Sequence, residues 1–268
     1  MAEDAAAGDD AGGVPTLAFA ENGVATITLR RPRHLNRLHR EDLQTLQAHF
    51  ASLTALPALS GVRVLVLTAT GRAFCSGFNL QELQQANAAG QDPQAFEQVV
   101  EALAALPLPT IARLNGSVYG GATDLALACD FRVGVQGMAL RMPAARLGLH
   151  YYPSGLQRGV SRLGLGAAKR LFLLAEALGA DELLRIGYLD ALTPADGLDA
   201  QVAAWTAALL AGAPLALRGM KASLNEVAEG RADAAMLRER EARCAASADL
   251  REGLAAQAER RTPRFTGR

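Results

Sequence analysis

The chain lacks several features that mark particular classes of protein. Its 3 cysteines, Cys75, Cys129 and Cys244, have no paired spacing, which excludes a disulfide framework and a zinc pattern and fits a reducing compartment. Its 4 histidines form no HxxxH or HExxH pair, so no metal site is expected. There is no excess of positive charge either: 27 Lys and Arg balance 27 Asp and Glu, which argues against nucleic acid as a partner.

Long apolar runs and a secretory leader are also missing. Runs such as LFLLAEAL are too short to span a bilayer, so no membrane partner is expected. The N-terminal MAEDAAAGDDAGG carries acids where a secretory signal carries bases, and it has no apolar segment. We expect residues 1–13 to form a disordered tail and the protein to be cytoplasmic.

What is present is an alternation of strand and helix patterns. Strands are predicted for VATITL (24–29), VRVLVLTA (62–69), TIARLNG (110–116) and FRVGV (131–135), which are β-branched or continuously apolar. Segments with helical spacing lie between them. This order predicts an α/β core with largely parallel strands, in which ligands bind at the carboxyl ends of the strands.

The second half of the chain has a different character. From about residue 155 alanine, leucine and arginine dominate and strand patterns disappear, and from residue 199 the pattern is helical almost to the end. We therefore expect an α/β core over 14–198 and a helical region over 199–268. The Ala- and Leu-rich sequence of this region offers more apolar surface than one small helical cap can bury, which predicts a homo-oligomer.

Two loops rich in small residues stand out, GRAFCSGFNLQEL and NGSVYGGATDLALACD. Neither has the GxGxxG or GxxxxGK[ST] spacing of a nucleotide site. The pair Gly120–Gly121 at a helix start exposes unpaired N–H groups at the positive end of the helix dipole. Such a site suits an anion or a polarised carbonyl oxygen, although close packing of a helix on a strand accounts for the glycines equally well.

These loops, with GVATITLRRPRHLNRL before them and SADLREGLAAQAERRTPRF after them, resemble in order the segments of the crotonase, or enoyl-CoA hydratase/isomerase, superfamily. The resemblance extends from about Leu17 to Phe265. It implies a spiral of ββα units followed by a helical trimerisation region, and an assembly that is a trimer or a hexamer. It also implies that two backbone N–H groups, those of Phe78 and Gly121, stabilise a thioester enolate.

The resemblance implies that coenzyme A enters as part of the substrate and that no separate cofactor is needed. Arg33 falls in the coenzyme-binding loop, and Arg260 matches a C-terminal lysine that often reaches the ligand of a neighbouring subunit. Solvated surface charge is the alternative interpretation of both arginines. Gln81 replaces a common lysine, which is expected to weaken adenine-nucleotide binding, and Asn79 and Gly120 complete the expected substrate-binding set.

The acid and base residues depart from the pattern of the hydratases, which use two glutamates. The first falls on Asp124, shorter by one methylene or ~1.5 Å, and the second falls on Ala144, which can transfer no proton. Tyr151 falls where a methylmalonyl-CoA decarboxylase of the superfamily has a tyrosine near the acyl group, whereas we expect Tyr152 to be structural. Phe78 resembles the chlorobenzoyl-CoA dehalogenase branch, where an aromatic side chain lines the acyl pocket.

The sequence therefore predicts an enzyme that acts on acyl-CoA thioesters. Hydration or double-bond isomerisation of an enoyl-CoA is expected first, with Asp124 as acid and base. Ala144 and Tyr151 make decarboxylation or hydrolysis of an acyl-CoA the alternative. A non-catalytic acyl-CoA-binding trimer is a different class, and RNA binding, known for some relatives, is disfavoured by the balanced charge.

Overall fold

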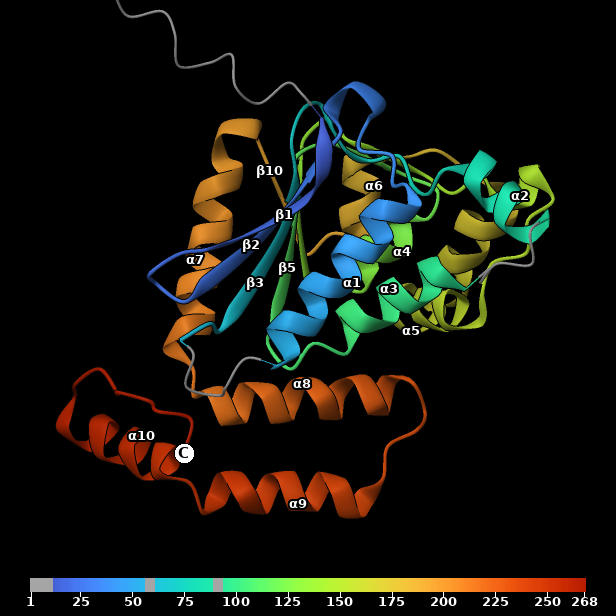
Figure 1. Ribbon diagram of the computed structural model, residues 1–268. Coiled ribbons are helices and arrows are strands. Elements are labelled where there is room, and N and C mark those ends of the chain that lie inside the picture. The colour runs from blue at the N-terminus through green and yellow to red at the C-terminus, as the bar shows by residue number, and fades with distance from the viewer. Residues whose placement is uncertain (1–11, 56–60, 89–93) are drawn as a thin grey trace, which may run out of the picture.

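The computed structural model describes residues 12–55, 61–88 and 94–268. Most of the tail expected over 1–13 therefore lies outside the described residues. In Figure 1 an α/β core stands above a separate layer of helices that form the end of the chain.

A six-stranded sheet forms the centre of the core, in the order β1-β2-β3-β5-β7-β10. Its strands are β1 (Gly13–Phe19), β2 (Val24–Arg30), β3 (Val64–Ala69), β5 (Thr110–Leu114), β7 (Phe131–Val135) and β10 (Ala191–Thr193). Neighbouring strands are parallel except β1, which pairs antiparallel with β2. The four predicted strands and their largely parallel arrangement are confirmed.

A smaller sheet has the order β4-β6-β8-β9. Its strands are β4 (Ala73–Cys75), β6 (Ser117–Tyr119), β8 (Ala139–Arg141) and β9 (Leu178–Gly179). The first three are parallel, and β9 is antiparallel to β8. The expectation that strands end before residue 155 is wrong for β9 and β10, because strands of two and three residues are too short to show a periodic pattern.

Helices cover the sheets. The core contains α1 (Arg40–Ala55), α2 (Leu80–Ala88), α3 (Ala95–Ala104), α4 (Ala122–Leu127), α5 (Pro153–Lys169), α6 (Ala180–Arg185), α7 (Leu198–Ala211), the 3-10 turns η1 (Pro32–His34), η2 (Ala144–Leu147) and η4 (Ala195–Gly197), and the π-helical turn η3 (Arg170–Leu174). The predicted helical spacing of α1 buries Leu43, Leu46 and Phe50.

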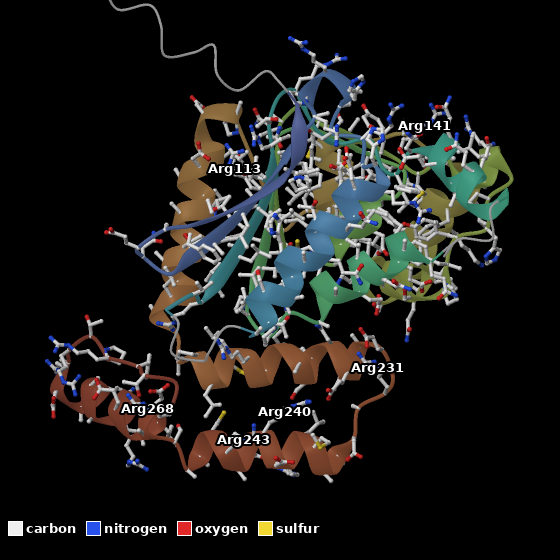
Figure 2. All side chains as sticks on the ribbon, viewed as in Figure 1. Arg113, Arg141, Arg231, Arg240, Arg243 and Arg268 are labelled. Atoms are coloured by element: carbon white, nitrogen blue, oxygen red, sulfur yellow. The ribbon has the colours of Figure 1, made fainter. Side chains whose placement is uncertain are left out.

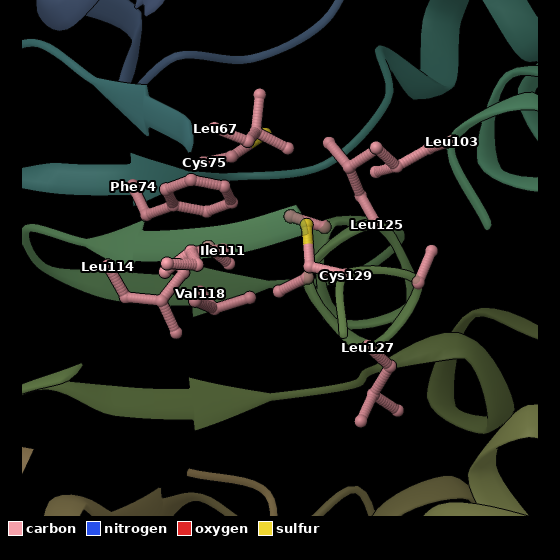
Figure 3. Close-up of a cluster of buried hydrophobic side chains, with 14 of the residues drawn as sticks. Leu67, Phe74, Cys75, Leu103, Ile111, Leu114, Val118, Leu125, Leu127 and Cys129 are labelled. Atoms are coloured by element: carbon pink, nitrogen blue, oxygen red, sulfur yellow. The ribbon is translucent and has the colours of Figure 1, made fainter. Parts of the chain in front are cut away.

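Buried apolar side chains join the two sheets to α4. Figure 3 shows this cluster, which includes Leu67 of β3, Phe74 of β4 and Leu125 of α4. Cys75 and Cys129 lie in it, and burial raises the pKa of each thiol to about 12. Both cysteines therefore behave as small apolar residues of the core.

The last three helices, α8 (Pro214–Ala228), α9 (Ala234–Ala245) and α10 (Ala248–Glu259), lie below the core in Figure 1 and are called the C-terminal helices here. The sequence placed α7 with them, but α7 packs on the large sheet. Its Leu198 and Val202 belong to the core cluster, and its Trp205 ring lies 5.6 Å from that of Phe131. The chain leaves the core after α7.

Polar contacts join α8 to the core. The buried Lys221 Nζ lies 2.8 Å from both the Leu108 carbonyl oxygen and the Asp130 carboxylate. Asp130 in turn accepts from the Thr110 N–H at 2.7 Å. One buried lysine thus links α8 to the N-terminal ends of β5 and β7.

No single helix among the described residues combines the length and the apolar composition of a membrane span. The segments Ala195–Ala211 and Pro214–Ala228 meet those requirements only when taken together, and they are bent by 108° at their junction.

Candidate active site

The two loops that the sequence singled out meet at one edge of the small sheet. The loop from Ser76 to Phe78 follows β4, the pair Gly120–Gly121 follows β6, and these strands are parallel neighbours. β8, parallel to β6 on its other side, leads to Ala144. Because parallel strands end at the same edge of a sheet, the expected donors and the position of the missing glutamate come together there.

Glycine is required where these loops touch. Gly77 has φ +87°, a left-handed conformation that L side chains rarely adopt. A Cβ at Gly77 would lie 2.9 Å from the Tyr119 carbonyl oxygen and 3.0 Å from the Gly121 nitrogen. Gly120 is left-handed as well, with φ +56°. A side chain at Gly77 would therefore push the two loops apart.

The local hydrogen bonds leave the N–H groups of Phe78 and Gly121 unused. Phe78 forms an isolated bridge with Leu38, and this bridge uses the N–H groups of Leu38 and Asn79. Gly121 is the N-cap of α4, where the helix offers its first N–H groups no internal partner. Neither N–H donates to any group within residues 12–55, 61–88 and 94–268. Two unused donors on touching loops can bind the oxygen of a polarised carbonyl.

Asp124, the expected acid and base, is held by two side chains. Arg158 Nε donates to Asp124 Oδ1 at 2.8 Å, and the Tyr152 hydroxyl donates to Asp124 Oδ2 at 2.7 Å. Arg158 Nη2 lies 3.5 Å from the same Oδ2 and donates to Glu101 at 2.6 Å. Asp124 is 1% exposed, so both of its oxygens are engaged in a buried network.

Arg158 supplies the charge that balances Asp124. Burial disfavours the charged guanidinium, but the carboxylates of Asp124 and Glu101 outweigh it and raise the pKa of Arg158 above its ordinary value. Removing one partner of such a buried pair leaves an uncompensated charge and is strongly destabilising. Asp124 is therefore a shielded acceptor rather than a carboxylate open to water.

Tyr151 and Tyr152 extend the network. The Tyr151 hydroxyl donates to the Tyr152 hydroxyl at 3.1 Å, and the two rings stack at 4.2 Å. Burial and then the charge of Asp124 raise the pKa of both phenols well above the usual value, so both stay protonated near neutral pH. A Cβ at Gly155 would lie 2.4 Å from the Tyr151 ring and 2.9 Å from Asp124 Oδ2, which explains the glycine at this contact.

Ala144 is buried at the start of η2 and presents only a methyl group. The nearby His150 is exposed, and its Nδ1 lies 2.8 Å from the Tyr151 carbonyl oxygen. His150 therefore contacts the backbone of the tyrosine segment rather than the hydroxyl network.

A line of aromatic rings connects the donor loop to the tyrosines. The rings in contact are, in order, Phe78, Phe96, Tyr152, Tyr151 and Phe172. Phe96 also covers Gly121, where an added Cβ would lie 2.8 Å from the Phe96 ring. The whole chain has 8 Phe, 4 Tyr and 1 Trp, so this site gathers a large share of the rings and has an apolar wall.

Apart from Arg260, the residues expected to bind the coenzyme lie in or next to the same loops. Arg33 is exposed in η1. The buried Asn36 ties the segment after η1 to the strands, since its amide donates to carbonyls after β3 and in β4 at 2.8 and 2.9 Å. Asn79 Oδ1 accepts from the Gln81 N–H at 3.1 Å and so caps α2, while the Gln81 side chain is exposed.

Arg260 is not brought to these residues within the chain. It ends α10 in a left-handed conformation, with φ 55°, and is exposed. In Figure 1, α10 lies below the core, while the segment that contains Arg33 lies at its top. A contact from Arg260 to the ligand of a neighbouring copy stays a prediction.

Sequence reasoning missed Phe96 and Arg158 and treated Tyr152 as structural. No motif marks Phe96, because contact between α3 and α4 depends on tertiary packing. Arg158 had one usable signal: it shares the buried face of α5 with Gly155 and Gly159. A buried helix face made of glycine and arginine indicates a partner carboxylate, because an unpaired guanidinium is costly to bury.

The chain belongs to the enoyl-CoA hydratase/isomerase family, whose family model matches residues 20–268. It is an enzyme of this family, and membership implies an acyl-CoA substrate. The crotonyl-CoA hydratase of Syntrophomonas wolfei subsp. wolfei (strain DSM 2245B / Goettingen) is 30% identical over 252 residues, which cover 91% of this chain and 95% of that protein. The 2,3-dehydroadipyl-CoA hydratase of Escherichia coli (strain K12) is 30% identical over 248 residues, with 91% and 96% covered.

Solved structures agree with this assignment. The crystal structure of an enoyl-CoA hydratase from Bacillus anthracis superposes with a TM-score of 0.87 at 27% identity, covering 96% of this chain and 100% of that chain. The fold is therefore the α/β crotonase fold, and the resemblance seen in the sequence is confirmed.

Proposed function

We propose that the protein binds an acyl-CoA thioester and stabilises its enolate with the N–H groups of Phe78 and Gly121. The observation that carries this proposal is the pair of unused donors on touching loops, beside the buried Asp124. Each donor aimed at a developing oxyanion can lower the barrier by ~3 kcal/mol. Arg33, Asn79, Gly120 and Gln81 surround the coenzyme, which is part of the substrate.

Within the family, hydration or isomerisation of an enoyl-CoA is the first candidate reaction. Both relatives named above are hydratases. The resemblance in the sequence implies that Asp124 falls at the position of the first glutamate. In both reactions a proton must reach or leave a carbon of the acyl chain, and Asp124 is the carboxylate that lies beside the donor loops.

Decarboxylation of an acyl-CoA is the second candidate, and a specific observation favours it. Both oxygens of Asp124 already accept hydrogen bonds, and Ala144 offers no second carboxylate. Loss of CO₂ forms the enolate without a base that activates water, so it places the smallest demand on this site. Tyr151, which the resemblance places where a methylmalonyl-CoA decarboxylase has a tyrosine, is joined to Asp124 through Tyr152. Thioester hydrolysis is a further outcome of the test below.

A homo-oligomer, either a trimer or a hexamer, completes the proposal. Met220, Leu224 and Val227 project from one face of α8 and are 55%, 67% and 57% exposed. Apolar side chains at this spacing form a stripe that a second copy of the chain can cover.

The test is an assay of the purified protein with crotonyl-, 3-enoyl- and methylmalonyl-type CoA esters. It is combined with incorporation of deuterium from D₂O at the α-carbon of butyryl-CoA, which reports enolate formation whatever the overall reaction. We expect exchange together with turnover of at least one ester. Binding of the esters without exchange or turnover would contradict the proposal and favour a non-catalytic acyl-CoA-binding protein.

A further inference from the structure

The position of Asp124 poses a problem for any reaction at the acyl chain. Its carboxylate is one methylene shorter than a glutamate, is 1% exposed and faces Arg158. A base must come within hydrogen-bond distance, about 2.6–3.2 Å, of the proton it takes. A group that bridges Asp124 to the acyl chain would solve the problem.

The Tyr152 hydroxyl has the geometry of such a bridge. It donates to Asp124 Oδ2 at 2.7 Å and accepts from the Tyr151 hydroxyl at 3.1 Å. Of the two side chains that hydrogen-bond Asp124, Tyr152 is partly exposed whereas Arg158 is buried, and Tyr151 behind Tyr152 is buried as well.

Ring contacts place Tyr152 toward the two donors. Its ring centroid lies 6.1 Å from that of Phe96, and the Phe96 ring lies against Gly121 and 6.2 Å from the Phe78 ring. Tyr152 is therefore linked through the Phe96 ring to the loops that would hold the thioester oxygen.

We infer that the Tyr152 hydroxyl is a catalytic residue that relays a proton between the α-carbon of the acyl-CoA and Asp124, with Arg158 as the residue that positions Asp124. The inference rests on the proposed function. In the forward step the α-carbon C–H bond breaks and its electron pair becomes the enolate, whose oxygen is held by the two N–H groups. The proton passes to the Tyr152 oxygen while the proton of Tyr152 passes to Asp124 Oδ2, and the reverse step returns it.

A relay fits this site better than proton donation by a tyrosine alone. A net loss of the Tyr152 proton would place a phenolate beside the Asp124 carboxylate, and two like charges at 2.7 Å are strongly disfavoured. In the relay Tyr152 stays neutral, and the charge change falls on the Asp124–Arg158 pair and on the enolate.

The test compares deuterium exchange into butyryl-CoA by four variants and the unaltered protein. Tyr152→Phe keeps the ring and removes the hydroxyl, and it should reduce exchange about 10²-fold or more while CoA-ester affinity is unchanged. Asp124→Asn should lose a similar factor, and the double variant should lose no more than either single change, because the two groups act as a unit. Tyr188→Phe is the matched control, since the Tyr188 hydroxyl donates only to the adjacent Thr123 carbonyl at 3.1 Å; it should leave exchange within about twofold of the unaltered protein.

The outcomes separate the relay from the proposed function. Exchange by the unaltered protein that persists in Tyr152→Phe but fails in Asp124→Asn would overturn the relay alone. Losses that multiply in the double variant would do the same. Absence of exchange by the unaltered protein with every ester would overturn the proposed function and the relay together.

The positioning role of Arg158 has its own readout. Arg158 Nε donates to Asp124 Oδ1 at 2.8 Å, and Glu101 of α3 accepts from the same guanidinium at 2.6 Å. Without the guanidinium, Asp124 loses the contact that fixes its orientation toward Tyr152. Arg158→Gln should therefore reduce exchange while CoA-ester affinity is unchanged, and Arg158→Lys should restore part of the loss. A loss that Arg158→Lys does not restore would contradict this role.

Discussion

The α/β core and the C-terminal helices are stabilised in different ways. In the core, side chains from both sheets and from α1, α3 and α4 pack into one apolar cluster. Among the C-terminal helices, α8 buries only Lys221, α9 buries no residue, and α10 buries Asp249 and Ala256. Figure 2 shows dense side chains in the core, while between α8 and α9 Arg240 crosses to Glu226, with distances of 2.6 and 2.7 Å.

The core and the C-terminal helices therefore have different roles. The loops and the network around Asp124 all belong to the core, so the apolar cluster holds the candidate site in place. Helices that bury almost no apolar surface depend on packing against something else for their stability. In the proposed oligomer, a second copy of the chain would supply this packing at the exposed apolar face of α8.

The largest expected effect on the free energy of unfolding comes from truncating a leucine in the core, compared with truncating one on α8. Leu67→Ala should reduce the free energy of unfolding by about 2–5 kcal/mol, because Leu67 is 0% exposed and its loss leaves a cavity. Leu224→Ala, at 67% exposure, should change it by less than about 0.5 kcal/mol in the monomer. Urea unfolding at low protein concentration measures both, and equal losses would remove the distinction between the two regions.

Lys221→Met breaks the polar link between the regions. It leaves the Leu108 carbonyl without this donor and the Asp130 carboxylate without its cation, at a cost of about 1–3 kcal/mol. Hydrogen exchange of the α8 amides should become faster while that of β3 is unchanged. Faster exchange throughout the core would show instead that α8 and the core unfold as one unit.

Leu224→Asp tests the apolar face of α8. A charge at the centre of this face should weaken self-association at least tenfold, which corresponds to about 1.4 kcal/mol. Sedimentation equilibrium at micromolar concentration measures the change, and Glu239→Asp on α9, a side chain that pairs with Arg243, is the control. A 28.1 kDa monomer already in the unaltered protein would contradict the oligomer.

The smallest effect concerns the cysteines. Cys75 and Cys129 are fully buried and the pKa of each is raised to about 12, so neither should react with a thiol reagent at pH 8 in the folded protein. Cys244 of α9 is partly exposed and should react. Titration before and after unfolding should therefore count one thiol and then three. Three reactive thiols before unfolding would mean that the core opens readily.

The sequence was informative where a pattern is long or the chemistry is local. Each strand with a continuous apolar or β-branched run was predicted, as were α1 and the two loops at the edge of the small sheet. β1 was not, because Pro15 and the exposed side chains of this edge strand interrupt its alternation. The position of α7 was missed because a helix rich in alanine and leucine can pack on a sheet or on another chain.

The candidate site was predictable only in part for a similar reason. Phe78, Gly121 and Asp124 lie in the two loops that carry the family resemblance, which is how the sequence singled them out. Arg158 and Phe96 reach the site through the packing of α5 and α3 on α4, and no spacing in the sequence reports that contact. A local motif can be recognised in the sequence, whereas a contact between helices that are distant in the chain cannot.

The most direct test of the central claim, an enolate held by the Phe78 and Gly121 N–H groups, compares Gly121→Pro with Gly121→Ala. Gly121 has φ −57°, which proline can adopt, and its N–H has no partner within the described chain. Both variants add a Cβ that requires the Phe96 ring to shift, but only proline removes the donor. The account predicts that deuterium exchange into butyryl-CoA falls about 10²–10³-fold in Gly121→Pro and stays within about tenfold of the unaltered protein in Gly121→Ala. Equal exchange by the two variants would contradict it.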